Sequence, residues 1–120
     1  MKILIADDSR VMRQIIIRTL RQAGYSGHDI IEATDGSSAL DLANSHCPDL
    51  ILSDWNMPGM DGIDVLCRLR AGGNRTPFGF VTSEGSVVMR QRAQNAGAAF
   101  LIAKPFRLES FTDALDPILG

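Results

Sequence analysis

The sequence LILSDWNMPGMDGIDVLCRL, residues 50–69, contains one complete unit of the predicted fold. Leu50–Leu52 is a short continuous apolar run, which is typical of a strand that is buried on both faces. From Ile63 onward the apolar residues recur at helical spacing. Asp61-Gly62 is therefore interpreted as the start of a helix rather than as a hairpin turn.

The same pattern of strand, loop and helix occurs along the whole chain. Four further apolar runs occupy Ile3–Ala6, Ile30–Ile31, Phe78–Val81 and Phe100–Ala103, and stretches of helical spacing separate the runs. Residues 86–95 have the thinnest apolar stripe of these predicted helices. The apolar residues expected to share one helical face are Val11, Ile15, Ile16 and Leu20 in the first helix, Leu40 and Ala43 in the second, Ile63, Leu66 and Leu69 in the third, and Leu108, Phe111, Leu115 and Ile118 in the last.

Alternation of strands and helices predicts an α/β fold: a doubly wound, flavodoxin-like parallel sheet of five strands with five helices on both faces. The strand at 30–31 is the least apolar, because Asp29 and Glu32 flank it, and we expect it at an edge. The first and third strands are the most apolar and are expected in the middle. This arrangement fits the strand order 2-1-3-4-5.

Length and composition limit the function classes. A chain of 120 residues, 45% of them apolar, predicts one domain over 1–120 with no output domain. A net charge of −2 with scattered Lys and Arg argues against a nucleic-acid partner. The chain has no signal peptide and no apolar run near the roughly 20 residues that cross a bilayer, so a cytoplasmic protein without membrane insertion is expected. Cys47 and Cys67 are predicted to be buried or inert thiols.

Polar side chains follow the strands at their ends. Asp7 and Asp8 follow the first strand, Asp54 the third, Thr82 the fourth and Lys104 the fifth. Sites in such sheets form beyond the carboxyl ends of the strands, where the strand order reverses, which here lies between the first and third strands. We therefore expect three carboxylates, a hydroxyl and an ammonium group to meet at one end of the sheet.

Three crowded carboxylates repel one another, and one Lys does not offset them. Mg²⁺ prefers oxygen ligands, and no softer ligand is nearby in the predicted fold. We expect a Mg²⁺ site on Asp8 and Asp54, with Asp7 acting through water.

A metal ion, an ammonium group and a hydroxyl are a recurrent set for handling a phosphoryl group. No Ser/His or Cys/His pair falls at a strand end, which leaves a carboxylate as the nucleophile and an acyl phosphate as the product. Asp54 is the predicted acceptor, because it stands alone on a central strand beside the expected metal.

In this order and at these separations, the motifs of the chain resemble the receiver domain of bacterial two-component response regulators, in particular the single-domain chemotaxis type. The resemblance covers essentially the whole chain. The motifs are Asp7-Asp8, Ser53-Asp54-Trp55-Asn56-Met57-Pro58-Gly59-Met60-Asp61-Gly62, Val81-Thr82-Ser83-Glu84, Ala96-Gly97-Ala98 and Lys104-Pro105-Phe106.

The resemblance implies that a histidine kinase donates a phosphoryl group from its phosphohistidine to Asp54. It implies that Asp8, Asp54 and the backbone carbonyl of Asn56 bind Mg²⁺, with Asp7 in support. The expected output is either the binding of a downstream protein or the transfer of the phosphoryl group to another protein. The resemblance implies the surface of the fourth helix, the fifth strand and the fifth helix as the contact. Such a protein catalyses only its own phosphorylation and autodephosphorylation and is not otherwise an enzyme.

The resemblance also assigns roles around the acceptor. Thr82 and Lys104 contact the phosphoryl oxygens, and a cis peptide bond is expected at Lys104-Pro105. Asn56 and Glu84 occupy positions that modulate the attacking water, which implies a short-lived phosphorylated form.

One position departs from the family pattern. Receiver domains usually have Tyr or Phe three residues before the Lys, as part of the output switch, and this chain has Leu101 there. Phe100 is adjacent, but strand alternation points it to the other face. The phosphorylation chemistry is expected to be retained, whereas the aromatic part of the switch is not carried over.

Three other functions are alternatives. A receiver-fold interaction module that works without phosphorylation is the main alternative. A Mg²⁺-dependent phosphohydrolase would usually have a second Asp two residues after the nucleophile, where this chain has Asn56. A flavin- or nucleotide-binding module would need a phosphate-binding loop after the first strand, where Asp7-Asp8 would repel phosphate.

Overall fold

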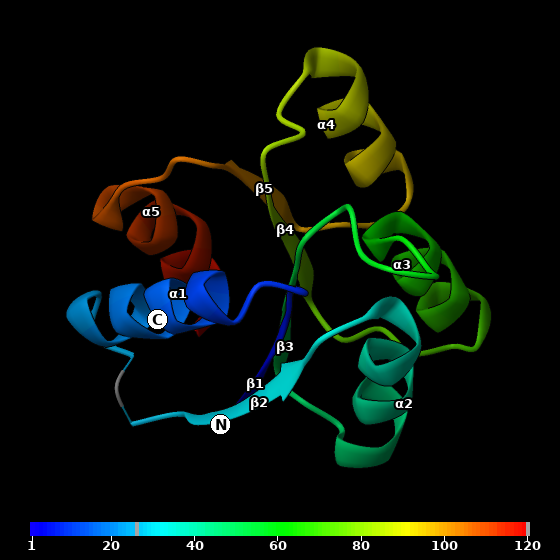
Figure 1. The fold of residues 1–120 in the computed structure, drawn as a ribbon, viewed down its shortest axis with the longest axis horizontal. Coiled ribbons are helices and arrows are strands. Elements are labelled where there is room, and N and C mark those ends of the chain that lie inside the picture. Colours follow the sequence, from blue (N-terminus) through cyan, green and yellow to red (C-terminus); the bar gives the residue numbers. More distant parts are fainter. Residues whose placement is uncertain (26, 120) are drawn as a thin grey trace.

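The computed structural model describes residues 1–25 and 27–119, and these residues form one parallel sheet covered by helices on both faces (Figure 1). The strand order is β2-β1-β3-β4-β5, and every neighbouring pair is parallel. The predicted fold class, strand order and edge position of the second strand are therefore confirmed. The elements are β1 (Lys2–Ala6), α1 (Arg10–Gln22), β2 (Asp29–Ala33), α2 (Gly36–His46), β3 (Leu50–Ser53), α3 (Gly62–Ala71), β4 (Phe78–Thr82), α4 (Val87–Asn95), β5 (Phe100–Ala103) and α5 (Leu108–Leu119).

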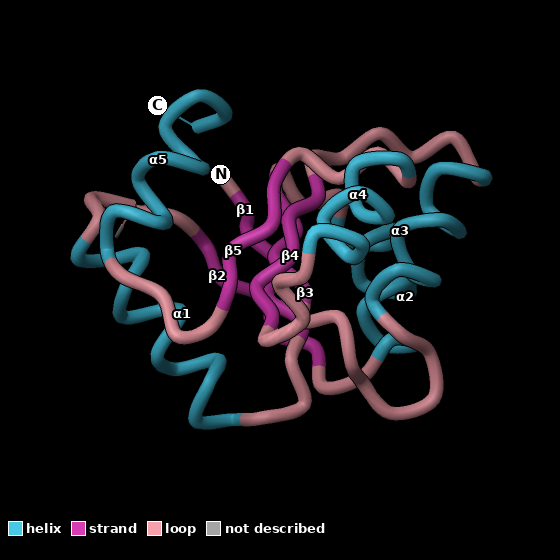
Figure 2. Tube along the Cα trace, turned by 90° about the horizontal axis from the view of Figure 1, so that it is seen from above, coloured by secondary structure: helices cyan, strands magenta, loops and turns pink. Residues whose placement is uncertain are grey.

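Two helical layers cover the sheet. Helices α1 and α5 lie on one face, and α2, α3 and α4 lie on the other, with the sheet between them (Figures 1 and 2). Alternation along each strand sends successive side chains into different layers. On β1, Leu4 packs toward α2 and α3, while Ile3 and Ile5 pack toward α1 and α5.

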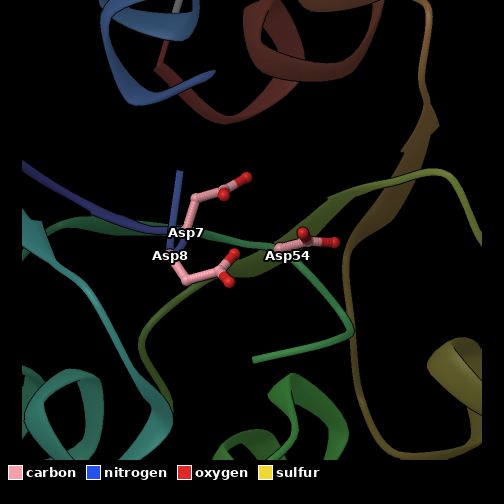
Figure 3. A group of neighbouring side chains, drawn as sticks. All are labelled: Asp7, Asp8 and Asp54. Atoms are coloured by element: carbon pink, nitrogen blue, oxygen red, sulfur yellow. The ribbon is translucent and has the colours of Figure 1, made fainter. Parts of the chain in front are cut away.

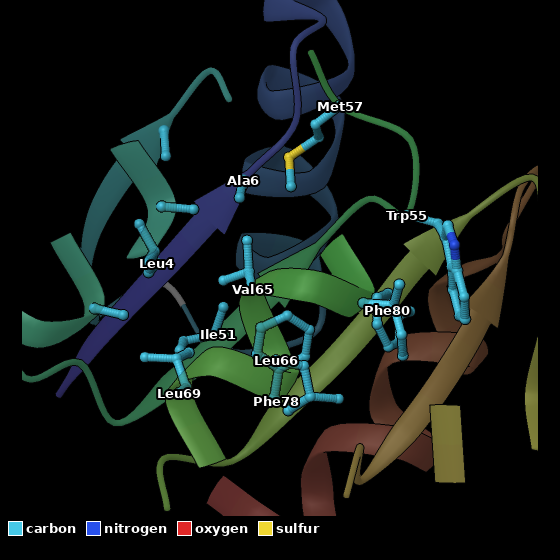
Figure 4. Packing of buried hydrophobic residues seen from close by; sticks show 14 of the residues in the cluster. Leu4, Ala6, Ile51, Trp55, Met57, Val65, Leu66, Leu69, Phe78 and Phe80 are labelled. Atoms are coloured by element: carbon cyan, nitrogen blue, oxygen red, sulfur yellow. The ribbon is translucent and has the colours of Figure 1, made fainter. Parts of the chain in front are cut away.

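The core on the side of α2, α3 and α4 is built around large apolar side chains from three central strands (Figure 4). Phe78 and Phe80 pack edge to face, with ring centroids 5.2 Å apart, and Phe80 also contacts Trp55 at 4.7 Å. Such aromatic pairs contribute about 0.5–1.5 kcal/mol beyond their burial. Because Trp55 directly follows Asp54, this core anchors the loop on which the predicted acceptor lies.

The prediction for the buried face of α1 is partly wrong. Ile16 and Leu20 are buried, but Val11 is 70% exposed and Ile15 is 38% exposed. At 3.6 residues per turn, Val11 and Ile15 lie on one face and Ile16 and Leu20 on another. The residue one turn before Ile16 is Arg13, and it is the side chain that is buried there.

Three further expectations can be compared with the structure. The thin helix predicted at 86–95 forms as α4, although Ala93 is its one fully buried residue. Leu108 begins α5 but is 38% exposed. Cys47 and Cys67 are free and exposed, so they are not buried as one alternative of the prediction had it, and their inertness stays a prediction. Within the described residues, no helix combines the length and apolar character needed to cross a membrane.

Candidate functional site

The register of the sheet brings the acidic residues after β1 and the acidic residue after β3 together. Ala6 pairs with Ser53 across β1 and β3, and the backbone N–H of Asp54 donates to the Ala6 carbonyl at 2.8 Å. Asp7 and Asp54 therefore leave neighbouring strands at the same level. Figure 3 shows Asp7, Asp8 and Asp54 as one group, and each offers a carboxylate oxygen within 4.8 Å of the others.

The three carboxylates differ in exposure. Asp7 is 1% exposed, Asp54 is partly buried and Asp8 is exposed. Both oxygens of Asp7 already have protein donors: the Ser9 N–H at 2.9 Å and the Lys104 ammonium group at 2.9 Å. A buried carboxylate needs such partners to offset its lost hydration. Asp8 and Asp54 are therefore the carboxylates best placed to face an ion, with Asp7 behind them.

Lys104 directly follows β5 and reaches this group across β4. Its backbone N–H donates to the Thr82 carbonyl at 2.8 Å, which continues the pairing of β4 and β5 by one residue. Its ammonium group lies 2.9 Å from Asp7 Oδ2 and 3.2 Å from Asp54 Oδ2. The Lys104-Pro105 peptide bond is cis, as expected.

The loop after β3 holds Asp54 closely. Asp54 Oδ1 accepts from the Trp55 N–H at 2.7 Å, and the Gly62 N–H donates to the Trp55 carbonyl at 2.7 Å. Helix α3 thus begins directly against the loop that carries Asp54. A Cβ at Gly62 would collide with the Asp54 carbonyl oxygen, so no larger residue fits there without moving Asp54.

Thr82 at the end of β4 contacts Glu84, and Glu84 contacts Asn56 on the loop after β3. Thr82 is fully buried, and its Oγ1 accepts from the Glu84 N–H at 3.2 Å. Accepting that bond leaves the hydroxyl proton free to be donated elsewhere. Asn56 Nδ2 donates to Glu84 Oε1 at 3.1 Å, so the two predicted modulating side chains are in direct contact.

Leu101 occupies the position at which the sequence departs from the family pattern. It is partly buried against the core beneath α4, while Phe100 packs on the α5 side of the sheet. The prediction that Phe100 faces away from the Leu101 side is therefore confirmed. Arg90 on α4 donates to the carbonyls of Leu101 at 3.1 Å and of Gly85 at 3.2 Å, and so links β5 to the loop after β4.

Sequence reasoning missed three arginines near this site. Arg90 bridges the loop and β5, and Arg92 places its guanidinium 5.3 Å from the centre of the Trp55 ring. Arg13 donates to the Asp7 carbonyl at 2.8 Å. The available signal was spacing: Arg13 precedes Ile16 by three residues and Leu20 by seven, which places it in the buried stripe of α1.

The donor set fits Mg²⁺. The three side chains offer carboxylate oxygens, the ligand type that Mg²⁺ prefers, and exposed Asp8 leaves a side open to the waters that this ion usually keeps. Receiver domains generally bind Mg²⁺ at an acidic pocket of this kind.

Comparison with known proteins agrees with this geometry. The family model described as "Response regulator receiver domain" matches residues 3–116. Chemotaxis protein CheY-3 of Vibrio cholerae is 38% identical over 120 residues, which cover 98% of this chain and 91% of that protein. Chemotaxis protein CheY of Pseudomonas aeruginosa is also 38% identical, with 98% of this chain and 95% of that protein covered. The structure of chemotaxis protein CheY4 of Vibrio cholerae superposes with a TM-score of 0.84 at 35% identity, covering 98% of each chain.

Proposed function

Because this chain belongs to the response regulator receiver family, we propose that it is a signalling switch in which Asp54 accepts a phosphoryl group from the phosphohistidine of a histidine kinase. The family itself supports a phosphorylation-dependent switch. The observation that carries the proposal is the position of Asp54, whose carboxylate is partly exposed at the end of a central strand, beside the other two carboxylates and 3.2 Å from the Lys104 ammonium group.

The proposed step is a displacement at phosphorus. An oxygen of the ionised Asp54 carboxylate attacks the phosphorus atom, a P–O bond forms and the P–N bond to the kinase histidine breaks. The electron pair of that bond returns to the ring, which leaves as neutral imidazole when its other nitrogen carries a proton. Aspartate is an established nucleophile for such covalent intermediates.

The neighbouring side chains have defined roles in this proposal. Lys104 now lies 3.2 Å from Asp54 Oδ2, so its ammonium group can contact a phosphoryl oxygen attached there. The Thr82 hydroxyl donates a hydrogen bond to another phosphoryl oxygen. Asp8, Asp54 and the Asn56 carbonyl would hold Mg²⁺, with Asp7 in support, and the bound ion would offset the negative charge of the phosphoryl oxygens and the carboxylates.

Loss of the phosphoryl group requires water to attack the same phosphorus atom. Asn56 lies two residues after Asp54 and is hydrogen-bonded to Glu84, and in this proposal the two side chains contact that water. We propose that this pair sets the lifetime of the phosphorylated form. The chain then acts on no separate substrate and catalyses only its own phosphorylation and dephosphorylation.

The proposed output is binding of a downstream protein through α4, β5 and α5. Val87 and Val88 at the start of α4 are 83% and 68% exposed, directly after the loop that carries Glu84. Apolar side chains this exposed are suited to a protein contact. Arg90 connects this helix to both the loop and β5.

The experiment that tests the proposal is intact-mass measurement after incubation with acetyl phosphate and Mg²⁺. One added phosphoryl group is expected, and it should be absent with EDTA and in the Asp54→Asn variant. A short-lived acyl phosphate could escape detection, so beryllofluoride binding is measured in parallel by Trp55 fluorescence and NMR. If folded protein shows neither a mass gain nor a response to beryllofluoride, the interaction module that works without phosphorylation takes its place.

A further inference from the structure

Arg13 is a buried cation that the phosphorylation chemistry does not use. It lies on α1, its side chain is 10% exposed, and it occupies a position in an otherwise apolar stripe with Ile16 and Leu20. Burying a guanidinium group is unfavourable unless its donors are paired. The hydrogen bonds of the Arg13 guanidinium group therefore explain why the side chain is buried.

Two nitrogens of the Arg13 guanidinium have partners. Nη1 donates to the backbone carbonyl of Asp7 at 2.8 Å, and Nε donates to Glu32 Oε1 at 2.9 Å. Glu32 lies near the end of β2, one of the two edge strands. The arginine therefore connects the first helix and this edge strand to the peptide group that joins Asp7 to Asp8.

That peptide group carries the two acidic residues of the turn. The Asp7 carbonyl shares one rigid plane with the N–H of Asp8, so its rotation would turn both side chains. The Asp7 carboxylate is held separately by Ser9 and Lys104. Asp8 is exposed, and no hydrogen bond in the described part of the chain holds its carboxylate, so its direction depends on its backbone.

We propose that Arg13 is a positioning residue for the Mg²⁺ site: it fixes the Asp7–Asp8 peptide so that the Asp8 carboxylate is directed toward Asp54, and Glu32 orients Arg13 for this task. The inference rests on the proposed Mg²⁺ site and deepens it. Without Arg13, the buried Asp7 carbonyl loses its donor and the peptide turns toward water. Groups that orient metal ligands from behind typically change metal affinity by about 10- to 100-fold when they are removed.

Charge alone predicts the opposite effect, which makes the idea testable. Arg13 is a cation near the ion, so removing its charge by itself would strengthen Mg²⁺ binding by removing repulsion. The double variant Arg13→Met, Glu32→Gln removes one positive and one negative charge, so the net charge of −2 is unchanged. Any loss of affinity in that variant reports position rather than charge.

Arg70 provides a matched control. It also donates to backbone carbonyls, those of Asn74, Thr76 and Gly97 at 3.0, 2.9 and 3.1 Å. These contacts lie near the beginnings of β4 and β5, whereas the acidic group follows the ends of β1 and β3. Arg70→Met should therefore lower stability through lost carbonyl bonds while leaving Mg²⁺ affinity within about twofold of the original.

The test is isothermal titration of each folded variant with MgCl₂, without any phosphodonor. The double variant should bind Mg²⁺ about 10-fold more weakly than the original. Arg13→Lys, which can donate to the Asp7 carbonyl but cannot span both partners, should fall between the two. A double variant that is folded, shown by its circular dichroism, yet binds Mg²⁺ with the original affinity would overturn the role of Arg13. Failure of the original protein to bind Mg²⁺ would instead overturn the proposed metal site.

Discussion

The ammonium group of Lys104 lies 3.2 Å from the carboxylate of Asp54, although the two residues are 50 positions apart in the chain. The same ammonium group bonds to buried Asp7 at 2.9 Å. Lys104 thus reduces the repulsion between Asp7 and Asp54 before any ion binds, and after phosphorylation its ammonium group is placed for a phosphoryl oxygen. The Lys104 side chain therefore contributes to the stability of the unphosphorylated protein and to the proposed chemistry at Asp54.

Replacing Lys104 by Met should destabilise the Mg²⁺-free protein by about 2 kcal/mol, because two charge-assisted hydrogen bonds are lost and the carboxylates remain. Adding Mg²⁺ should narrow the difference, since the ion supplies positive charge to the folded state. Urea unfolding in EDTA and in MgCl₂ measures both values. Lys2→Met, at an exposed position, is the control and should stay within about 0.5 kcal/mol of the original. Equal stability of Lys104→Met and the original in EDTA would contradict this account.

Asn56→Ala and Glu84→Ala should each slow the loss of the phosphoryl group, by about 10-fold, if the bonded pair orients the attacking water. Because the two side chains contact each other at 3.1 Å, the double variant should be slowed much less than the product of the single effects. Loss of phosphoryl mass with time, after rapid removal of the phosphodonor, gives these rates. Unchanged rates in both single variants, or fully multiplicative effects, would exclude a joint role.

Activation should move the backbone amides of residues 83–88. The Glu84 N–H now donates to Thr82 Oγ1, and a Thr82 hydroxyl that turns toward a phosphoryl oxygen would release that amide. Because Arg90 donates to the carbonyls of both Gly85 and Leu101, movement of the loop after β4 should also displace β5. Amide NMR spectra with and without beryllofluoride and Mg²⁺ test this, with Asn74 near the beginning of β4 as the reference that stays still. Unchanged shifts at 83–88 would disprove the movement.

Tyr25 gives a prediction for alkaline pH. Burial, together with its hydrogen bond to Asp116 and the charge of that carboxylate, raises the pKa of Tyr25 to about 12. A raised folded-state pKa means that this contribution to stability is complete below the ordinary value of 10.0 and is lost as the pH rises from there through about 12. Tyr25 is the single tyrosine, so absorbance at the tyrosinate band follows it directly. Asp116→Asn should lower the pKa, and an original protein that titrates at the ordinary value would contradict the contact.

Much of this site follows from the sequence because the sheet is regular. Once strands alternate with helices, the residues after each strand must meet at the carboxyl ends of the parallel strands. Asp7, Asp54 and Lys104 could be placed together from that rule alone. The strand ends were correct to within one or two residues. The position of Phe100 opposite Leu101 followed from alternation for the same reason.

What could not be predicted depends on contacts between elements. The burial of Arg13 requires both a free carbonyl at Asp7, directly after β1, and a carboxylate at Glu32 on β2. The spacing of α1 allows that residue to be buried but does not supply the partners, and apolar Val11 was expected inside in its place. The contact of Arg92 with Trp55 depends likewise on how α4 packs over the loop after β3.

The most direct test of the central claim is to locate the phosphoryl group. The protein is incubated with acetyl phosphate and Mg²⁺ and then treated with sodium borohydride, which reduces an acyl phosphate of aspartate to homoserine. Peptide mass mapping should find homoserine at position 54 and unchanged aspartate at Asp7 and Asp8, and Asp54→Asn should yield none. Homoserine at another position, or none in a protein that gains phosphoryl mass, would contradict the assignment of Asp54 as the acceptor.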